Sequence, residues 1–387
     1  MEFKTMRPDY HHSLVNLLAS VEQGLGGTPG RYEPLAALPP QQVAAARRVV
    51  LLVIDGLGYE YLQTQTACFP DWQRDVLTSV FPSSTAPAIT SVMTGVAPQQ
   101  HAITGWFMYL RELGTVATIL PFRSRIGAVP LDKLGVHIGR VMGGSSIFNR
   151  LKVPSDYLIG RKLVDSAYSQ WAAGNAERYG YKRLYPCFAE LRRLARAEGG
   201  QRFIYAYWPT LDTLAHQHGI ASPIVRRHWQ TVAERLQHLA ESLRGSDTLL
   251  IVTADHGFMD TQPESVVSLE QHQELRECLL LPPCVEPRAA GCYLREGQRQ
   301  RFERYIVQHL DRQFELHAVD DLIGAGWFGL GDPHPLLAQR LGDYLLIGRD
   351  RHVLTERLPG EDAWKMIGVH GGLSSAEMQV PLLVVEC

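Results

Sequence analysis

Cysteine is scarce in this sequence, and no two cysteines form a recognisable motif. Six occur among 387 residues, without a Cys-x-x-Cys pair or a regular spacing. A disulfide framework and a zinc knuckle both require such spacing, so the sequence indicates neither. Scattered cysteines are typical of free thiols in a reducing compartment, and we expect a cytoplasmic protein.

Long hydrophobic runs are also absent. The longest apolar segments, such as residues 49–54 and 380–385, have the length of a β-strand and fall far short of a membrane span. Residues 1–27 contain no continuous hydrophobic region and no small-residue cleavage site, so they do not resemble a signal peptide. We expect a soluble protein with no membrane partner.

A strong charge of either sign is missing as well. The chain has 38 lysines and arginines against 40 aspartates and glutamates, for a formal charge of −2. This balance provides no overall field for nucleic acid, so any recognition of phosphate must be local. Residues 295–304 hold four arginines but only Phe302 as an aromatic side chain, a pattern typical of a solvated helix face. We expect a small-molecule partner and no stable nucleic-acid partner.

Three apolar segments that are typical of buried strands stand out in the sequence, and an acidic residue follows each of them. The apolar runs at residues 47–54, 202–208 and 248–253 are typical of strands buried on both faces of a parallel sheet. Between the last two, residues 222–245 have apolar side chains at three- and four-residue steps, which predicts an amphipathic crossover helix. This alternation predicts a doubly wound α/β fold, in which helices flank a mostly parallel sheet and ligands gather at the carboxyl ends of its strands.

The chain is predicted to have one main domain with an insertion. Residues 260–365 contain shorter elements and Pro- and Gly-rich patches, and residues 380–385 must then return to the main sheet as a further strand. We therefore expect residues 47–387 to form the main domain, with an inserted α+β subdomain at about 260–365. Residues 1–46 are predicted to be an N-terminal extension.

Carboxylates and imidazoles stand at the predicted strand ends. Asp212 and His216 are four residues apart, so on a helix they share one face and can reach one ion. Asp255 and His256 closely follow a buried strand, and His370 lies among glycines that let the backbone approach a ligand. Taken singly, each has a simpler explanation: a surface pair, a helix cap or a turn histidine without a partner.

A candidate nucleophile precedes a predicted helix. Hydroxyl side chains follow Pro82, and a helix-like stretch then runs to Gly95, so Thr85 falls near a helix N-terminus. Free backbone N–H groups and the positive end of the helix dipole favour an anion there. A plain helix cap is the simpler interpretation of this segment on its own.

Taken together, these segments resemble the alkaline phosphatase superfamily, and most closely its type I phosphodiesterase and nucleotide pyrophosphatase branch. The resemblance rests on VIDG at 53–56, FPSSTAP at 81–87, MTG at 93–95, His101, DTLAH at 212–216, Gly219, TADHG at 253–257, HGGLS at 370–374 and Val380-Pro381. Their order and approximate spacing agree with the family from about residue 47 to the end.

The resemblance implies a two-metal hydrolase of phosphate esters. One ion would be bound by Asp212, His216 and His370, and the other by Asp55, Asp255, His256 and the Thr85 oxygen. Nitrogen and oxygen donors without a thiolate suit zinc, with manganese as an alternative. Two such ions would clamp the attacking and leaving oxygens at phosphorus, and Thr85 would form a covalent phospho-threonine. Ser84 is the second candidate for the nucleophile.

One residue departs from the family pattern. Trp106 stands where the nucleotide pyrophosphatase branch has an asparagine that donates a hydrogen bond to a phosphoryl oxygen. We expect a preference for phosphodiesters or pyrophosphates, with Trp106 covering the organic group of the substrate. The alternative for Trp106 is a core residue beneath the loop. His101 is predicted to be structural and His218 to be solvated.

Other functions remain open. A phosphomonoesterase of the same superfamily is the nearest alternative. A non-catalytic, metal-binding scaffold is the alternative from a different class, although a scaffold has no physical need to keep all the ligands. The phosphoglycerate mutase branch is disfavoured because its large insertion is not obvious here. A sulfatase is disfavoured because the nucleophile segment lacks the Cys/Ser-x-Pro-x-Arg pattern.

Overall fold

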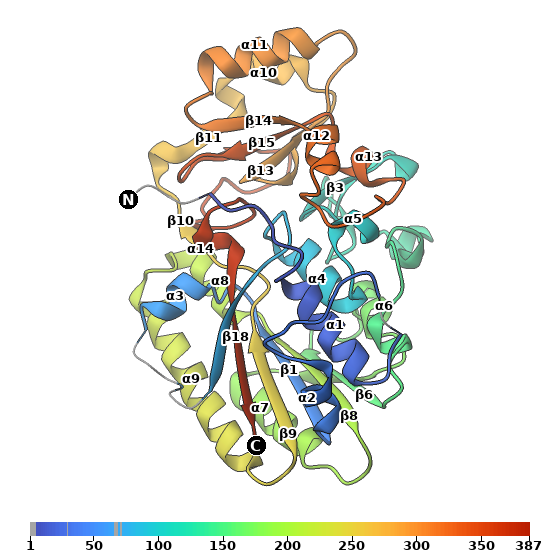
Figure 1. Ribbon diagram of the computed structural model, residues 1–387. Coiled ribbons are helices and arrows are strands. Elements are labelled where there is room, and N and C mark those ends of the chain that lie inside the picture. Colours follow the sequence, from blue (N-terminus) through green and yellow to red (C-terminus); the bar gives the residue numbers. More distant parts are fainter. Residues whose placement is uncertain (1–4, 29, 66–68, 70–71) are drawn as a thin grey trace.

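The computed structural model describes residues 5–28, 30–65, 69 and 72–387, and its main sheet has seven strands in the order β2-β18-β9-β1-β8-β6-β7 (Figure 1). In that order the strands are Gln73–Thr78, Gln379–Glu386, Thr248–Thr253, Arg48–Ile54, Arg202–Trp208, Ser155–Gly160 and Glu177–Tyr181. Neighbours pair in parallel, except that β18 is antiparallel to both β2 and β9. The predicted mostly parallel α/β sheet is confirmed, and residues 380–385 return to it within β18.

Strand β1 explains why the segments with acidic residues meet. All of its residues are buried, because β8 and β9 flank it on both sides. Ile54 pairs in register with Trp208, and Val53 pairs with Thr253, so three parallel strands end side by side. The segments that follow these strands therefore leave the sheet at one edge.

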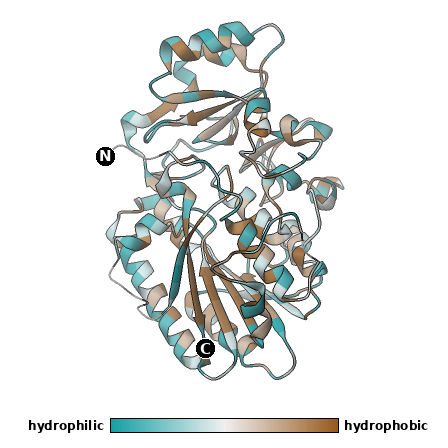
Figure 2. Ribbon diagram, viewed as in Figure 1, coloured by the Kyte–Doolittle hydropathy of each residue, from teal (hydrophilic) through white to brown (hydrophobic). Residues whose placement is uncertain are grey.

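Helices pack on the main sheet in two groups. One group comprises α1 (Leu14–Gly24), α4 (Thr85–Thr94) and α6 (Ala167–Ala173), and the other α7 (Leu184–Ala195), α8 (Thr210–His218) and α9 (Pro223–Leu243). Figure 1 shows α1 and α9 on opposite sides of the strands. Figure 2 shows hydrophobic residues gathered in the central strands and hydrophilic residues on the outer helices. Helix α9 confirms the predicted crossover helix, with Ser222 as its N-cap.

A second seven-stranded sheet lies above the first in Figure 1, in the order β14-β15-β13-β12-β3-β4-β5. Its antiparallel strands are Phe314–Ala318, Tyr344–Gly348, Ala289–Cys292, Cys284–Glu286, Phe107–Leu110, Thr115–Thr118 and Arg123–Ser124. Helices α10 (Gln273–Cys278) and α11 (Arg299–His309) cover its outer face. The sheet extends beyond the insertion predicted at about 260–365, because β3, β4 and β5 come from residues 107–124.

Alternate residues of β15 face opposite sides of the second sheet. Tyr344 and Leu346 pack in the cluster beneath α10 and α11. Leu345 and Ile347 belong to a different cluster, which includes Phe81 from the segment that leads into α4. The inner face of the second sheet therefore lies against the approach to the N-terminus of α4.

The N-terminal residues are part of the packed structure. Helix α1 is largely buried in the main hydrophobic core, and Glu22 on this helix pairs with Arg150 at 2.5 Å. The N–H of Met6 donates to Leu373 O at 2.7 Å, which ties this segment to the loop after β17 (Gly368–Val369). The predicted boundary at residue 46 stays a prediction. None of the helices within the described ranges has the length and apolar character of a membrane span.

Candidate metal centre

Six predicted ligands meet at the carboxyl edge of the main sheet. Asp55 follows β1, Asp212 and His216 lie on α8, Asp255 and His256 follow β9, and His370 follows β17. They form two groups of three, in each of which one donor atom per residue lies within 4.8 Å of the others. Apart from Thr85, which is not part of either group, these are the same residues as in the two ion sites that the resemblance implies.

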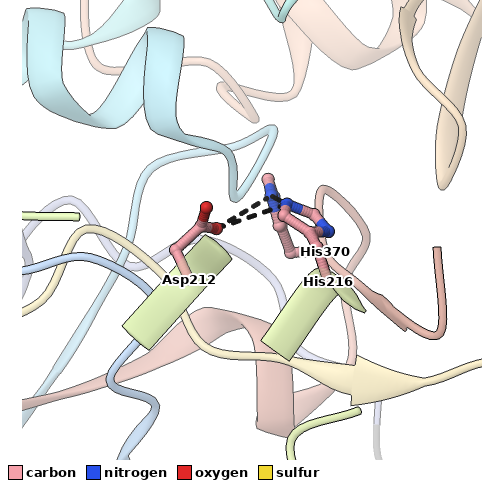
Figure 3. A group of neighbouring side chains, drawn as sticks. All are labelled: Asp212, His216 and His370. Carbon is pink, nitrogen blue, oxygen red and sulfur yellow. Dashed lines mark hydrogen bonds and ion pairs between the residues drawn. The ribbon is translucent and has the colours of Figure 1, made fainter. Parts of the chain in front are cut away.

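Asp212, His216 and His370 form the first group (Figure 3). His216 follows Asp212 by about one turn of α8, so both side chains share one face, and His216 Nε2 lies 3.3 Å from Asp212 Oδ1. His370 enters from a distant loop, and its Nε2 lies 3.3 Å from His216 Nε2 and 3.8 Å from Asp212 Oδ1. Three donor atoms thus converge from two separate segments.

Asp55, Asp255 and His256 form the second group, and all three are buried. His256 Nε2 lies 3.4 Å from Asp55 Oδ1 and 3.5 Å from Asp255 Oδ2. Thr85 Oγ1 lies 3.1 Å from the same nitrogen. The hydroxyl predicted to be the nucleophile is therefore next to the second group.

The two groups are in direct contact. His256, from the second group, stacks on His370, from the first, with ring centroids 3.7 Å apart. Phe258 packs edge-on against His216, His256 and His370, at centroid distances of 5.0, 5.5 and 5.1 Å. One aromatic ring thus supports all three imidazoles. Two ions bound here would be close neighbours, as a two-metal displacement at phosphorus requires.

Backbone carbonyls hold each imidazole in one tautomer. Nδ1 donates to a backbone oxygen in all three: His216 to Gly368 at 2.9 Å, His256 to Gly257 at 3.0 Å, and His370 to Ser83 at 3.2 Å. A carbonyl oxygen can only accept, so Nδ1 carries a proton, and in the neutral imidazole the lone pair is on Nε2. The Nε2 atoms of His216 and His370 face each other at 3.3 Å, so in the neutral imidazoles both lone pairs are directed toward the place where a cation would bind.

Each of the three carboxylates has one buried oxygen without a hydrogen-bond partner among the described residues. These atoms are Asp55 Oδ1, Asp212 Oδ1 and Asp255 Oδ2. They are the same oxygens that approach the imidazole Nε2 atoms. A buried carboxylate oxygen without a partner is costly unless a cation balances it. The residues therefore fit two divalent cations held by nitrogen and oxygen donors.

Burial and like charges shift the pKa values of these residues. Burial raises the pKa of Asp55 well above its usual range, and the charges of Asp212 and Asp255 raise it further. Burial also lowers the pKa of His370 well below its usual range, with the neighbouring imidazoles adding to the effect. For His216, burial lowers the pKa, but Asp212, the Gly368 carbonyl and the charge of Glu286 together outweigh burial and the net shift is upward. Bound cations would relieve the repulsion between the carboxylates.

Tyr207 supports Asp55 from within the sheet. The phenol O–H donates to Asp55 Oδ2, so the unpartnered Oδ1 is the oxygen left for an ion. Burial raises the pKa of Tyr207 well above its usual range, and the Asp55 charge raises it further. The phenol therefore stays protonated and remains a donor, which fixes the orientation of the carboxylate.

Two neighbouring hydroxyls at the start of α4 have different partners. Ser84 is the N-cap and Thr85 the first helical residue. The Ser84 O–H donates to Glu286 Oε1, whereas Thr85 Oγ1 contacts His256. The first N–H groups of a helix have no intrahelical partner, so an anion near Thr85 would meet free donors.

Glu286 is a residue of this site that the sequence analysis does not identify. It ends β12, is 6% exposed, and its Oε1 also accepts the Trp106 N–H at 2.7 Å. Burial raises the pKa of Glu286 to about 7, although its two hydrogen-bond donors lower it. Its only signal in the sequence is a single acid in a short segment of the insertion, outside every motif of the resemblance.

Trp106 is half-buried and lies outside the hydrophobic clusters formed by the described residues. It is therefore not one of the core residues of this part of the structure. His101 is fully buried, donates from Nε2 to Ser91 Oγ at 2.9 Å and accepts the Ile103 N–H at 3.0 Å. His218 is exposed at the end of α8. The last two observations agree with the predicted structural and solvated histidines.

The fold and the site define a class of protein: an α/β fold like that of alkaline phosphatase, with two adjoining Asp/His groups at the carboxyl edge of the sheet. The model of the type I phosphodiesterase / nucleotide pyrophosphatase family matches residues 49–125 and 148–323. The match covers more than half of the chain, and the chain belongs to this family. The branch predicted from the motifs is confirmed.

Individual relatives agree with this assignment. Ectonucleotide pyrophosphatase/phosphodiesterase family member 3 of Rattus norvegicus is 23% identical over 231 residues, which are 56% of this chain and 26% of that protein. The chain thus spans about a quarter of that relative's length. Murine ectonucleotide pyrophosphatase/phosphodiesterase 5 has a TM-score of 0.66 at 15% identity, covering 87% of each chain. Phosphonoacetate hydrolase from Sinorhizobium meliloti 1021 has a TM-score of 0.63 at 15% identity, covering 88% of this chain and 90% of that one. These structural likenesses show a shared fold.

Proposed function

We propose that the protein hydrolyses phosphodiesters or pyrophosphates of small molecules, with two divalent metal ions and Thr85 as the nucleophile. The observation that carries this proposal is the position of Thr85 Oγ1, 3.1 Å from His256 Nε2 and at the N-terminus of α4. A helix cap alone would not need a hydroxyl beside two groups of metal-binding side chains. Family membership supports the same chemistry.

Zinc is the proposed ion, with manganese as the alternative. Each group offers imidazole nitrogen and carboxylate oxygen and no thiolate, which suits both metals. The first group would hold one ion, and the second group with the Thr85 oxygen would hold the other. When bound, such ions favour the deprotonated hydroxyl and stabilise the charge that develops at phosphorus and on the leaving oxygen.

Side chains and backbone groups of the protein orient the reacting groups. The carbonyl partners of Nδ1 keep each imidazole in place, and Tyr207 holds Asp55 through its second oxygen. The start of α4 offers N–H donors to an anionic phosphoryl group. The Thr85 oxygen attacks phosphorus, the bond from phosphorus to the departing alcohol or phosphate breaks, and phospho-threonine forms. Water then displaces Thr85 from phosphorus and regenerates the hydroxyl.

The substrate class is supported by relatives and by Trp106. An inactive variant of murine ectonucleotide pyrophosphatase/phosphodiesterase 5 has been solved with AMP, and the phosphonoacetate hydrolase with phosphonoformate. Both ligands carry a phosphorus oxyanion. In this chain the half-buried Trp106 lies beside Glu286 and offers a flat apolar surface to an organic substituent.

Metal analysis combined with turnover of bis(p-nitrophenyl) phosphate tests the proposal. We expect about two bound ions per chain, turnover that chelation abolishes, and recovery on adding zinc or manganese. Protein without metal that does not respond to either ion would contradict the mechanism. Faster hydrolysis of p-nitrophenyl phosphate would favour the monoesterase, and two bound ions without any turnover would favour the scaffold.

A further inference from the structure

Glu286 is a fixed carboxylate in the wall of the site, outside the six metal-binding residues. Its Oε1 accepts the Ser84 O–H and, at 2.7 Å, the Trp106 N–H. No hydrogen bond joins Oε2 to the residues that the structure describes. Two donors on one oxygen hold the carboxylate in place, because turning it would break both hydrogen bonds.

Glu286 lies between the nucleophile segment and the His370 loop. Ser84, which it contacts, directly precedes Thr85. Gly371, directly after His370, has φ +109°, and a Cβ on this residue would lie 2.9 Å from Glu286 Cβ. The glycine is therefore required by the close approach of Glu286. A phosphoryl group under attack from Thr85 would have this carboxylate on one side.

We propose that Glu286 is a specificity-determining residue, whose carboxylate disfavours phosphate monoesters and so directs the site toward diesters. The inference rests on the proposed function, since it assigns a cause to the diester preference. It requires no movement of the chain, because the carboxylate is already held by Ser84 and Trp106.

The physical reason is the second negative charge of a monoester. Above about pH 6 a phosphate monoester carries close to two negative charges, whereas a diester carries one. Two divalent cations alone would favour the more highly charged ligand. A fixed carboxylate that is largely buried repels the additional charge more strongly than it would in water. The Trp106 N–H donates to Glu286, so this donor is not available to a phosphoryl oxygen.

The Glu286→Gln variant distinguishes an effect of the carboxylate charge from an effect of its hydrogen bonds. Its amide oxygen can still accept from Ser84 and Trp106, so the wall keeps its hydrogen bonds while the charge is removed. At about pH 8.5, where Glu286 is ionised, we expect kcat/KM for p-nitrophenyl phosphate to rise by about tenfold. The value for bis(p-nitrophenyl) phosphate should stay within about threefold of wild type. The matched control is Glu356→Gln, which removes a largely buried carboxylate that pairs with Arg276 at 3.1 Å, and it should leave the ratio unchanged.

An unchanged ratio in folded Glu286→Gln protein, or an equal loss with both substrates, would overturn the inference while leaving diester hydrolysis intact. Wild-type protein that hydrolyses neither substrate would instead overturn the proposed function. Should the variant not fold, inhibition of wild type by methyl phosphate and dimethyl phosphate decides the matter. The singly charged dimethyl phosphate should inhibit more strongly, and stronger inhibition by doubly charged methyl phosphate would overturn the inference.

Discussion

Thr85 Oγ1 lies 3.1 Å from His256 Nε2, although 171 residues separate the two in the sequence. The contact joins the first residue of α4 to the segment that follows β9. Ser84, the neighbouring hydroxyl, is engaged by Glu286 instead. Two adjacent side chains of similar chemistry are thus held by different partners, and this difference can be tested by mutation.

Thr85→Ala should abolish turnover of bis(p-nitrophenyl) phosphate while leaving the fold and the metal content nearly intact. The proposed mechanism requires the hydroxyl as nucleophile, so we expect a loss of about a thousandfold or more in kcat. Ser84→Ala is the matched control, because it removes one hydrogen bond to Glu286 and should cost less than about tenfold. Near-normal activity in Thr85→Ala together with inactive Ser84→Ala would move the assignment by one residue.

Each of the two groups of side chains should hold its own metal ion, so a substitution in one group should remove only that ion. Asp212→Asn and His370→Ala change only the first group, so each should lower the content from about two ions to about one. Asp255→Asn should empty the second site in the same way. Elemental analysis of the purified variants measures this, with exposed His218 as the control, since His218→Ala should keep both ions. If any one of the three variants lost both ions, the sites would not be independent.

His101 should make the metal-free protein less stable in acid. Burial lowers its pKa to about 3, with the charge of Arg340 adding to the effect, whereas the unfolded chain has a value of about 6.5. Between these values the unfolded state binds the additional proton, so the free energy of unfolding falls as the pH falls from about 6.5 to 3. The contribution approaches about 1.4 kcal/mol per pH unit.

Urea unfolding at several pH values, in a chelator, measures this contribution against His101→Gln. The glutamine can still donate to Ser91 and accept from Ile103, but it does not titrate. The carboxylates and histidines of the metal groups titrate in both proteins, so the difference between the two slopes isolates His101. Equal slopes would show that His101 does not contribute to the acid sensitivity.

Most of the main sheet, and the convergence of the six candidate metal ligands, could be predicted from the sequence and its resemblance to the family. Asp55 and Asp255 closely follow continuous apolar runs, and parallel strands bring such positions to one edge. Asp212 and His216 share one face of α8 through their spacing. Each of these patterns is local in the sequence. Because the strands run in the same direction, the residues that follow them come together at one edge of the sheet.

Glu286 and the extent of the second sheet could not be predicted in the same way. Strands β3, β4 and β5 have only two to four residues each, too few for a period-two pattern. Glu286 belongs to the site only because β12 pairs with β3 and so places it beside Trp106. That pairing joins segments nearly two hundred residues apart, and neither segment has a sequence pattern that predicts the pairing.

Trp106 combines two features that suggest contact with the substrate. Its N–H is held by Glu286 at 2.7 Å, which fixes the backbone of the loop beside the nucleophile segment. Its ring is half-buried and belongs to none of the hydrophobic clusters of the described residues. A half-buried aromatic ring outside these clusters has apolar surface to offer a ligand.

Trp106→Ala should therefore weaken diester hydrolysis selectively. Loss of the aromatic surface should lower kcat/KM for bis(p-nitrophenyl) phosphate by about three- to tenfold. The value for p-nitrophenyl phosphate should change less, because the second organic group is the one that the ring covers. Trp106→Ala and Glu286→Gln should both lower the diester-to-monoester ratio, the first by lowering kcat/KM for the diester and the second by raising it for the monoester. The separate kcat/KM values therefore distinguish the two residues. Trp171→Ala, a half-buried tryptophan on α6, controls for general loss of packing. An unchanged ratio in folded Trp106→Ala protein would mean that the ring supports the loop and does not contact the substrate.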